Sequence, residues 1–118
     1  MPVIEVSTLP LGEEIDVPGA LAKVTTGVAA FIDEDPRGTW AIYRPISPRH
    51  FAEGSDTPAK QPAETHPAIV HVVANRPPEQ VAGLLEAVGG CVVKAFGLED
   101  GNVFVRFDAA DPERMFWG

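Results

Sequence analysis

Residues 68–80 read AIVHVVANRPPEQ, an apolar β-branched run that passes directly into a proline-rich helix start. Runs of Val and Ile of this length are typical of a buried strand. The two prolines fit the first turn of a helix, where no backbone hydrogen bond is lost, and Glu79 suits the positive end of the helix dipole. Apolar residues at helical spacing continue up to Gly97, a natural helix stop. The segment therefore predicts a strand, Ala68–Ala74, followed by a helix, Pro77–Phe96.

The same order of elements occurs twice along the chain. The predicted elements, in order, are a strand at Pro2–Ser7, a helix at Asp16–Asp33, a strand at Thr39–Arg44, a strand at Ala68–Ala74, a helix at Pro77–Phe96 and a strand at Asn102–Asp108. This order predicts two successive βαβ units in a single domain of residues 1–118. The units span about 2–53 and about 67–118, with a connecting loop at about 54–66.

The predicted helices carry apolar stripes but also contain glycines. Each glycine inside a helix costs roughly 1 kcal/mol relative to Ala. Close packing of the helices on the sheet would compensate for Gly27, Gly89 and Gly90, or the second helix breaks at the Gly89-Gly90 pair. Arg49–Ala52, in the proline-rich connection, has a further interpretation as a short extra strand. The apolar stripe of the first helix consists of Leu21, Val24, Val28, Phe31 and Ile32.

Side chains of the last predicted strand alternate between two characters. One set is apolar and consists of Val103, Val105 and Phe107; the other consists of Phe104, Arg106 and Asp108. Successive residues of a strand point to opposite faces of a sheet, so one face suits helix packing and the other suits a site. Two helices cover only one face of a four-stranded sheet. The sequence therefore predicts an α+β fold whose second face is covered by oligomerisation.

Composition and charge exclude several function classes. The formal charge of the 118 residues is -8, which argues against nucleic acid as a partner because binding to a phosphate backbone depends on Lys and Arg. No apolar run is long enough to cross a membrane, and no basic leader precedes an apolar core, so we expect a cytoplasmic protein. Cys91 is the only cysteine, and the three histidines lack metal-ligand spacing, so we expect no metal site.

Pro2 follows the initiator methionine and precedes a β-branched run. After loss of Met1, its nitrogen would be a secondary amine at the edge of a strand. An α-amino group titrates at about 7.7 to 8.0, and modest desolvation or a nearby cation lowers that pKa toward neutrality. Pro2 is therefore a candidate general base, although proline is also common at strand starts.

The Met-Pro start, the two βαβ units and the helix entry Asn75–Gln80 together resemble the tautomerase superfamily, over nearly the whole chain. That family uses an amino-terminal proline, and its long members assemble as trimers around a central barrel. Pro67–Gln80 resembles the opening of a 4-oxalocrotonate tautomerase subunit. Other stretches resemble other branches: Tyr43–Pro45 with Asn75–Pro77 is similar to malonate semialdehyde decarboxylase, Glu14–Val24 to 5-carboxymethyl-2-hydroxymuconate isomerase, and Val103–Phe107 with Phe116-Trp117 to macrophage migration inhibitory factor.

The resemblance implies roles for particular residues. Arg76 matches the substrate-binding arginine of the family, and its planar guanidinium suits a carboxylate. Phe104 and Arg106 match pocket-lining positions of the macrophage migration inhibitory factor branch, where a Tyr and an Asn stand. Asp35 lies within a residue or two of the catalytic carboxylate of the decarboxylase, whose second arginine is replaced here by Pro78. The candidate site therefore comprises catalytic Pro2, the substrate-binding residues Arg76, Arg106, Arg44 and Phe104, and the candidate catalytic carboxylate Asp35.

The resemblance implies a cofactor-independent tautomerase acting as a homotrimer on a small 2-oxo or 2-hydroxy-enoic acid, with Pro2 as general acid and base. A Pro2 that stays protonated near Asp35 or Glu5 would favour hydration or decarboxylation instead. Two alternatives stand beside this hypothesis. A βαββαβ chain also fits a ferredoxin-like module that binds a small molecule or is purely structural, and a trimer of the family fold can lack catalysis.

Overall fold

The computed structural model describes residues 2–52, 68–98, 102–111 and 113–114. Its elements are β1 (Val3–Thr8), α1 (Val17–Ile32), the short 3-10 helix η1 (Pro36–Gly38), β2 (Trp40–Pro45), the short 3-10 helix η2 (Pro48–His50), β3 (Ala68–Ala74), α2 (Pro78–Phe96) and β4 (Val103–Ala109). All six predicted elements are present, with ends within two residues of the predicted ones. The predicted loop at about 54–66 and the Phe116-Trp117 tail lie outside the described residues, and the assignment of 1–118 to one domain stays a prediction.

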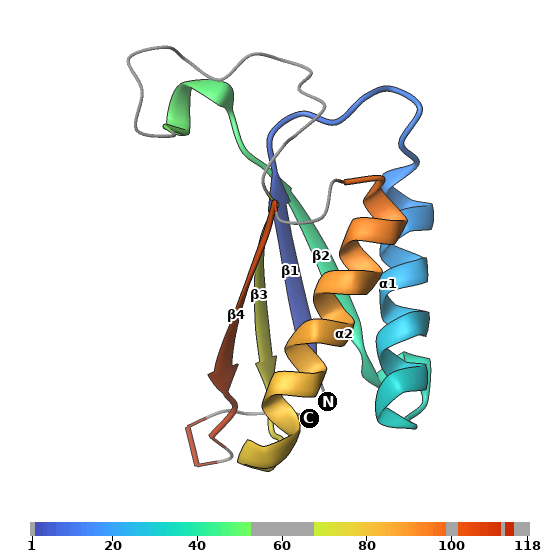
Figure 1. Cartoon of the computed structure of the whole chain (residues 1–118), viewed down its shortest axis with the longest axis vertical. Helices are drawn as coiled ribbons and strands as arrows, with labels where there is room; N and C mark the ends of the chain where they lie inside the picture. The colour runs from blue at the N-terminus through green and yellow to red at the C-terminus, as the bar shows by residue number, and fades with distance from the viewer. Residues whose placement is uncertain (1, 53–67, 99–101, 112, 115–118) are drawn as a thin grey trace.

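The four strands form one mixed sheet in the order β2-β1-β3-β4. β1 pairs in parallel with β2, β3 pairs in parallel with β4, and β1 and β3 run antiparallel at the centre (Figure 1). Each helix thus connects two adjacent parallel strands, which confirms the two predicted βαβ units. The ferredoxin-like alternative is wrong, because a ferredoxin-like sheet is antiparallel and separates the two strands that a helix connects.

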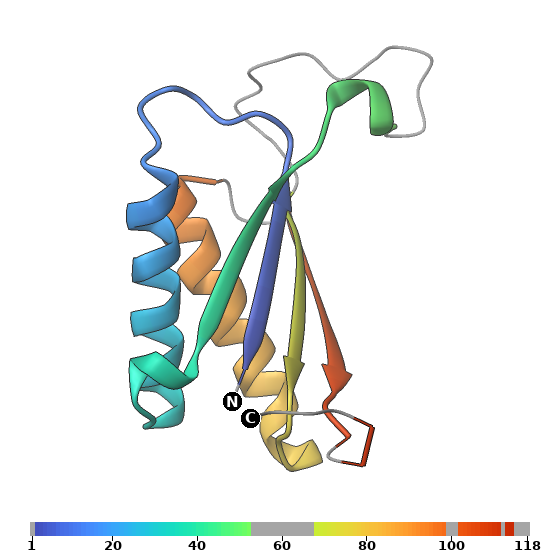
Figure 2. The ribbon, with the colours of Figure 1, turned by 180° about the vertical axis from the view of Figure 1, so that it is seen from behind.

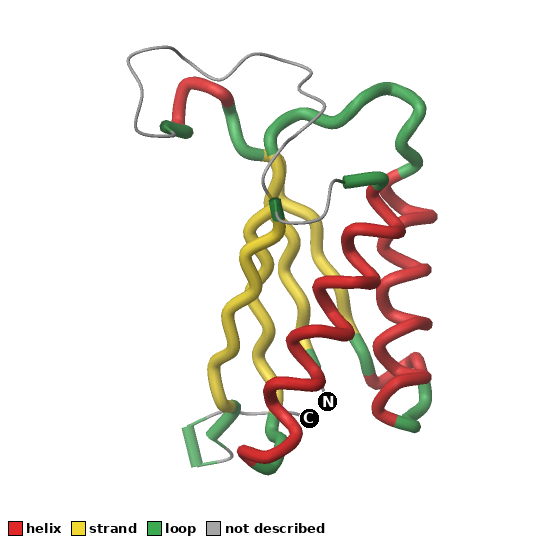
Figure 3. The backbone as a smooth tube through the Cα atoms, viewed as in Figure 1, coloured by secondary structure: helices red, strands yellow, loops and turns green. Residues whose placement is uncertain are grey.

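Both helices pack on the same face of the sheet, as the views from opposite sides show (Figures 1 and 2). The backbone trace shows the sheet and the helices as two layers, and no described helix lies over the other face of the sheet (Figure 3). The core lies between the layers and consists of Ile4, Val6, Ala20, Val24, Val28, Ala68, Val70, Val72, Ala74, Leu84, Val88, Val92 and Phe96. The predicted arrangement of two helices on one face is therefore confirmed.

The glycines of the helices mark close contacts rather than breaks. α2 is continuous through Gly89 and Gly90, so the alternative of a broken helix is wrong. A Cβ at Gly27 would lie 2.7 Å from Sγ of Cys91, and one at Gly89 would lie 3.4 Å from a methyl group of Val105. Glycine at position 27 therefore lets α1 approach α2 closely, whereas a Cβ at position 89 would make an ordinary van der Waals contact with β4.

Two local predictions are corrected by the structure. Arg49–Ala52 is not a strand, because Pro48 and the Ser47 cap begin the 3-10 helix η2 there. Phe31, predicted on the buried stripe of α1, is 56% exposed. Its ring lies over Gly83 of α2, at the end of the helix pair, instead of under the sheet.

Candidate active site

Pro2 lies at the end of the sheet where the parallel pair of β1 and β2 begins and the parallel pair of β3 and β4 ends. It is buried, and its carbonyl oxygen accepts a hydrogen bond of 3.0 Å from the backbone nitrogen of Trp40. The next residue, Val3, is paired with Trp40 of β2 on one side and with Val73 of β3 on the other. Pro2 therefore lies between the start of β2 and the end of β3, in the middle of the sheet edge.

Arg76 lies at the same end, because β3 runs antiparallel to β1 and ends beside its start. Its guanidinium forms an ion pair with the carboxylate of Glu34, which follows α1, and its side chain is only 17% exposed. The Nε atom of Arg76 is buried and has no hydrogen-bond partner among the described residues. A cavity of about 440 Å³ opens between the end of α1 and the start of α2, and Arg76 lines it together with Phe31 and Gln80.

Asp35 also belongs to this end of the molecule. It caps η1, the turn that leads into β2, by accepting a bond of 2.9 Å from the backbone nitrogen of Arg37. Its carboxylate also forms an exposed ion pair of 2.9 Å with the Arg37 side chain. These bonds hold the pKa of Asp35 below its usual value, so the group is a carboxylate at neutral pH.

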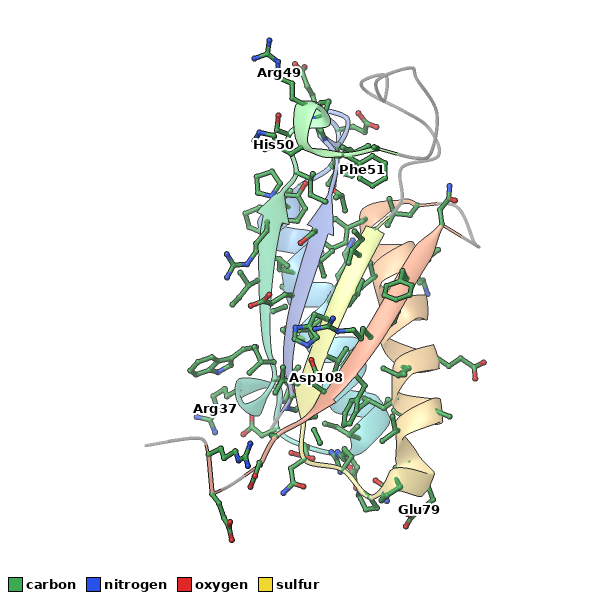
Figure 4. All side chains as sticks on the ribbon, turned by 90° about the vertical axis from the view of Figure 1, so that its left-hand side faces the viewer. Arg37, Arg49, His50, Phe51, Glu79 and Asp108 are labelled. Atoms are coloured by element: carbon green, nitrogen blue, oxygen red, sulfur yellow. The ribbon has the colours of Figure 1, made fainter. Side chains whose placement is uncertain are left out.

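The other candidate residues lie on the sheet face that the helices leave open. The register forms three rows across this face: Trp40, Val3, Val73 and Asp108; then Ile42, Glu5, His71 and Arg106; then Arg44, Ser7, Ile69 and Phe104. The row with Asp108 is the one nearest Pro2, and Figure 4 looks onto this face with Asp108 at its lower part. Arg44 and Phe104 therefore lie toward the opposite end of the sheet from Pro2.

The charged side chains of this face form hydrogen bonds and ion pairs with one another. Nε2 of His71 lies 2.5 Å from Oδ2 of Asp108, and that oxygen also accepts a bond of 3.1 Å from Arg106. The contact with His71, more than that with Arg106, lowers the pKa of Asp108. Arg44 and Glu5 form a longer ion pair of 3.5 Å.

The same face carries large exposed apolar side chains. They are Trp40 (51% exposed), Ile42 (39%), Ile69 (42%) and Phe104 (63%). These side chains come from β2, β3 and β4, so they extend across the whole sheet. Apolar exposure of this extent is typical of an interaction surface. We call this face, made up of the three rows, the open face.

Within one chain, the structure brings Pro2, Arg76 and Asp35 to one end of the sheet and leaves Arg44, Arg106 and Phe104 on the open face. Two residues of the proline end were missed from the sequence. Glu34 was missed because its partner is 42 positions away, and no local spacing points to it. Thr39 was missed as well; its hydroxyl is buried and has no partner among the described residues. Among all the residues that the structure describes, no three His, Cys, Asp or Glu side chains form a metal-binding group. No described helix is long and apolar enough to cross a membrane.

No family model matches the sequence, and no curated protein matches it. Solved structures with the same fold nevertheless cover nearly the whole chain. Native fused 4-OT matches with a TM-score of 0.81 at 14% identity, over 98% of this chain and 92% of that chain. Pt0534 inactivated by 2-oxo-3-pentynoate matches with a TM-score of 0.77 at 15% identity, over 96% and 89%. A macrophage migration inhibitory factor-like protein from Entamoeba histolytica matches with a TM-score of 0.71 at 11% identity, over 99% and 95%.

These structures are members of the tautomerase superfamily. The chain therefore has the α+β fold of that superfamily, as its sequence predicts.

Proposed function

We propose that the chain is a cofactor-independent tautomerase that acts on a small 2-oxo or 2-hydroxy-enoic acid, with the processed Pro2 as general acid and base. The observation that carries this proposal is that Pro2 and Arg76 lie at the same end of the sheet. Pro2 immediately precedes the central strand β1, and Arg76, partly sheltered from water, follows β3, the antiparallel neighbour of β1. An amine and a guanidinium at one site are the groups needed to move a proton on a carboxylate substrate.

The reaction needs one group that takes a proton from oxygen and returns it to carbon. The neutral Pro2 amine accepts the enol proton as the C=O bond forms, and the resulting prolinium donates a proton to the carbon end of the dienolate. Arg76 binds the substrate carboxylate and stabilises the negative charge while it is delocalised. No net proton, electron or group is gained or lost, so these residues suffice without a cofactor.

We further propose a homotrimer in which the open face of each copy meets its neighbours. The exposed aromatic and aliphatic side chains of that face support this assembly, and so does the fused 4-OT structure described as a symmetric trimer, which matches this chain with a TM-score of 0.75. Arg106, Phe104 and Arg44 would then line the cleft between copies and take part in substrate binding there. The cytoplasmic location stays a prediction from the sequence.

Hydration or decarboxylation is the second candidate chemistry, since it would use a protonated Pro2 and the carboxylate of Asp35. Asp35 does lie at the Pro2 end and is ionised at neutral pH. Its charge, however, is balanced by Arg37. This pairing favours a neutral amine and therefore tautomerase chemistry. A trimer without catalysis is the remaining alternative.

A matched pair of proline substitutions tests the proposal. The processed protein should ketonise phenylenolpyruvate or 2-hydroxymuconate, and Pro2→Ala should lower kcat/KM by about 100-fold or more. Pro10→Ala is the control, because Pro10 is exposed beyond the far end of β1. Equal loss in both variants, or activity in Pro2→Ala equal to that of the unsubstituted protein, would reject the role of Pro2.

A further inference from the structure

Two threonines are buried in the part of the chain that the structure describes, and only one of them is satisfied. The hydroxyl of Thr8 donates to the carbonyl oxygen of Leu9 and also contacts the hydroxyl of Tyr43, both at 2.7 Å. Thr39 is only 4% exposed, and its hydroxyl has no hydrogen-bond partner among the described residues. Because buried hydroxyls are nearly always paired, this unpaired one calls for a physical reason.

The neighbour of Thr39 across the sheet edge is Pro2. The parallel pairing of Val3 with Trp40 places Thr39 alongside Pro2, and the bond from Trp40 to the Pro2 carbonyl holds the two segments together. Thr39 has an extended backbone, with φ -111° and ψ 122°. Its side chain therefore points away from the open face, which Trp40 occupies, and lies on the same side of the sheet as Pro2.

The chain in which the Thr39 hydroxyl has this environment still carries Met1. With Met1 attached, the Pro2 nitrogen is a tertiary amide, with no hydrogen to donate. Removal of Met1 converts it into a secondary amine with one hydrogen and one lone pair. We infer that the Thr39 hydroxyl accepts a hydrogen bond from the Pro2 amine in the processed chain and so fixes the direction in which the nitrogen lone pair points.

Thr39 would thus be a positioning residue, and this role rests on the proposed function because it requires an amino-terminal proline. The ring nitrogen of a neutral amino-terminal proline inverts rapidly, so without such a bond either its hydrogen or its lone pair can face the substrate. Holding the hydrogen on Thr39 leaves the lone pair for the enol proton. An acceptor oxygen also favours the charged prolinium, so the same bond raises the pKa of the amine.

NMR titration of the processed protein with 15N-labelled proline measures that pKa without any need for turnover. Thr39→Val should lower the pKa of the Pro2 amine by about half a unit or more, and the acid limb of kcat/KM should move to lower pH with it. Thr39→Ser, which keeps the hydroxyl, should restore both values. Thr8→Val is the control, because Thr8 is equally buried but lies at the far end of β1.

Charged groups around this end of the sheet are left in place by the substitution, so a shift reports on the hydroxyl. They are Asp33, Glu34, Asp35, Arg37, Arg76, Glu79, Asp108, Asp111 and Arg114. Thermal unfolding gives a second, independent readout. In a chain whose Pro2 nitrogen is still acylated, Thr39→Val removes an unpaired hydroxyl and should not lower Tm, whereas in the processed chain it removes a hydrogen bond and should lower Tm.

The outcomes separate this inference from the proposed function. An unchanged Pro2 pKa in Thr39→Val would overturn the inference even if the protein is an active tautomerase. A lowered pKa that Thr39→Ser restores would support the hydrogen bond even if no enol substrate is turned over, in which case the proposed function alone fails. A pKa that falls equally in Thr8→Val would also overturn the inference.

Discussion

Glu34 and Arg76 join the two βαβ units by an ion pair at the end of the sheet where Pro2 leads into β1. One residue follows α1 and the other precedes α2, so the pair connects segments that are distant along the chain. The pair holds the guanidinium in place while it is largely shielded from water. A fixed arginine of this kind is pre-organised to bind an anion.

The first prediction concerns this arginine. Arg76→Ala should raise KM for a carboxylate enol substrate by about 10- to 100-fold, because a charge-assisted hydrogen bond is lost. The effect on kcat should be smaller, since Pro2 remains. Arg49→Ala is the control, because Arg49 is exposed at the opposite end of the sheet, as Figure 4 shows. Steady-state kinetics decide, and an unchanged KM in Arg76→Ala would contradict its role in binding.

The second prediction concerns the open face. Phe104→Glu should shift the protein from trimer toward monomer, because it places a charge within the proposed contact. Phe31→Glu is a matched control: Phe31 is similarly exposed but belongs to α1, away from this face. Sedimentation velocity measures both. The assembly proposal fails if Phe104→Glu stays as oligomeric as the unsubstituted protein, or if both variants dissociate alike.

The third prediction concerns Asp108, whose pKa is held below its usual value of 3.8, chiefly by the bond to His71. A lowered carboxyl pKa contributes stability that is fully present above pH 3.8 and is lost as the pH falls through the folded-state value. Asp108→Asn should therefore lower the urea midpoint at pH 7 and reduce its fall below pH 3.8. Asp111→Asn is the control, and an equal acid-induced fall in the Asp108→Asn and unsubstituted proteins would count against the contact.

The fourth prediction uses two glycines of the helices. Gly27→Ala should destabilise the protein by about 1 kcal/mol, because the added Cβ would lie 2.7 Å from Sγ of Cys91 and overpacking outweighs the gain in helix propensity. In a Cys91→Ala background the sign should reverse. Gly90→Ala should stabilise by about 1 kcal/mol, since nothing lies within 4 Å of its Cβ position. Urea unfolding measures the stability of all three variants. If Gly27→Ala stabilises the protein while Cys91 is still present, α1 and α2 are not in close contact.

The elements were predictable because their signals are local. The β-branched run Ala68–Ala74 and the stop at Gly97 depend on periodicity and backbone conformation, and the structure confirms both. Phe31 shows where a local pattern fails: its spacing matches the buried stripe, yet it is 56% exposed and its ring lies over Gly83 of α2. Tertiary position, which periodicity does not encode, decided its exposure.

The candidate site was predictable only in part, for the same reason. Pro2 and Arg76 lie in recognisable motifs, and the antiparallel pairing of β1 with β3 brings them to one end. Glu34 and Thr39 could not be predicted as site residues, because their roles depend on residues that are close in space but distant in sequence. Glu34 is a charged residue after a helix, and Thr39 is one residue in a turn. Only the folded chain shows that Glu34 pairs with Arg76, and that the buried Thr39 hydroxyl next to Pro2 has no partner in the part of the chain that the structure describes.

The central claim is that the free amine of Pro2 moves the proton, and the most direct measurement changes only that nitrogen. Protein whose Met1 is removed, verified by intact mass, is compared with protein whose Pro2 nitrogen remains acylated by an amino-terminal extension. The processed protein should ketonise phenylenolpyruvate, and the acylated protein should lose nearly all of that rate because an amide nitrogen does not accept a proton at neutral pH. Equal rates from the two proteins would contradict the account.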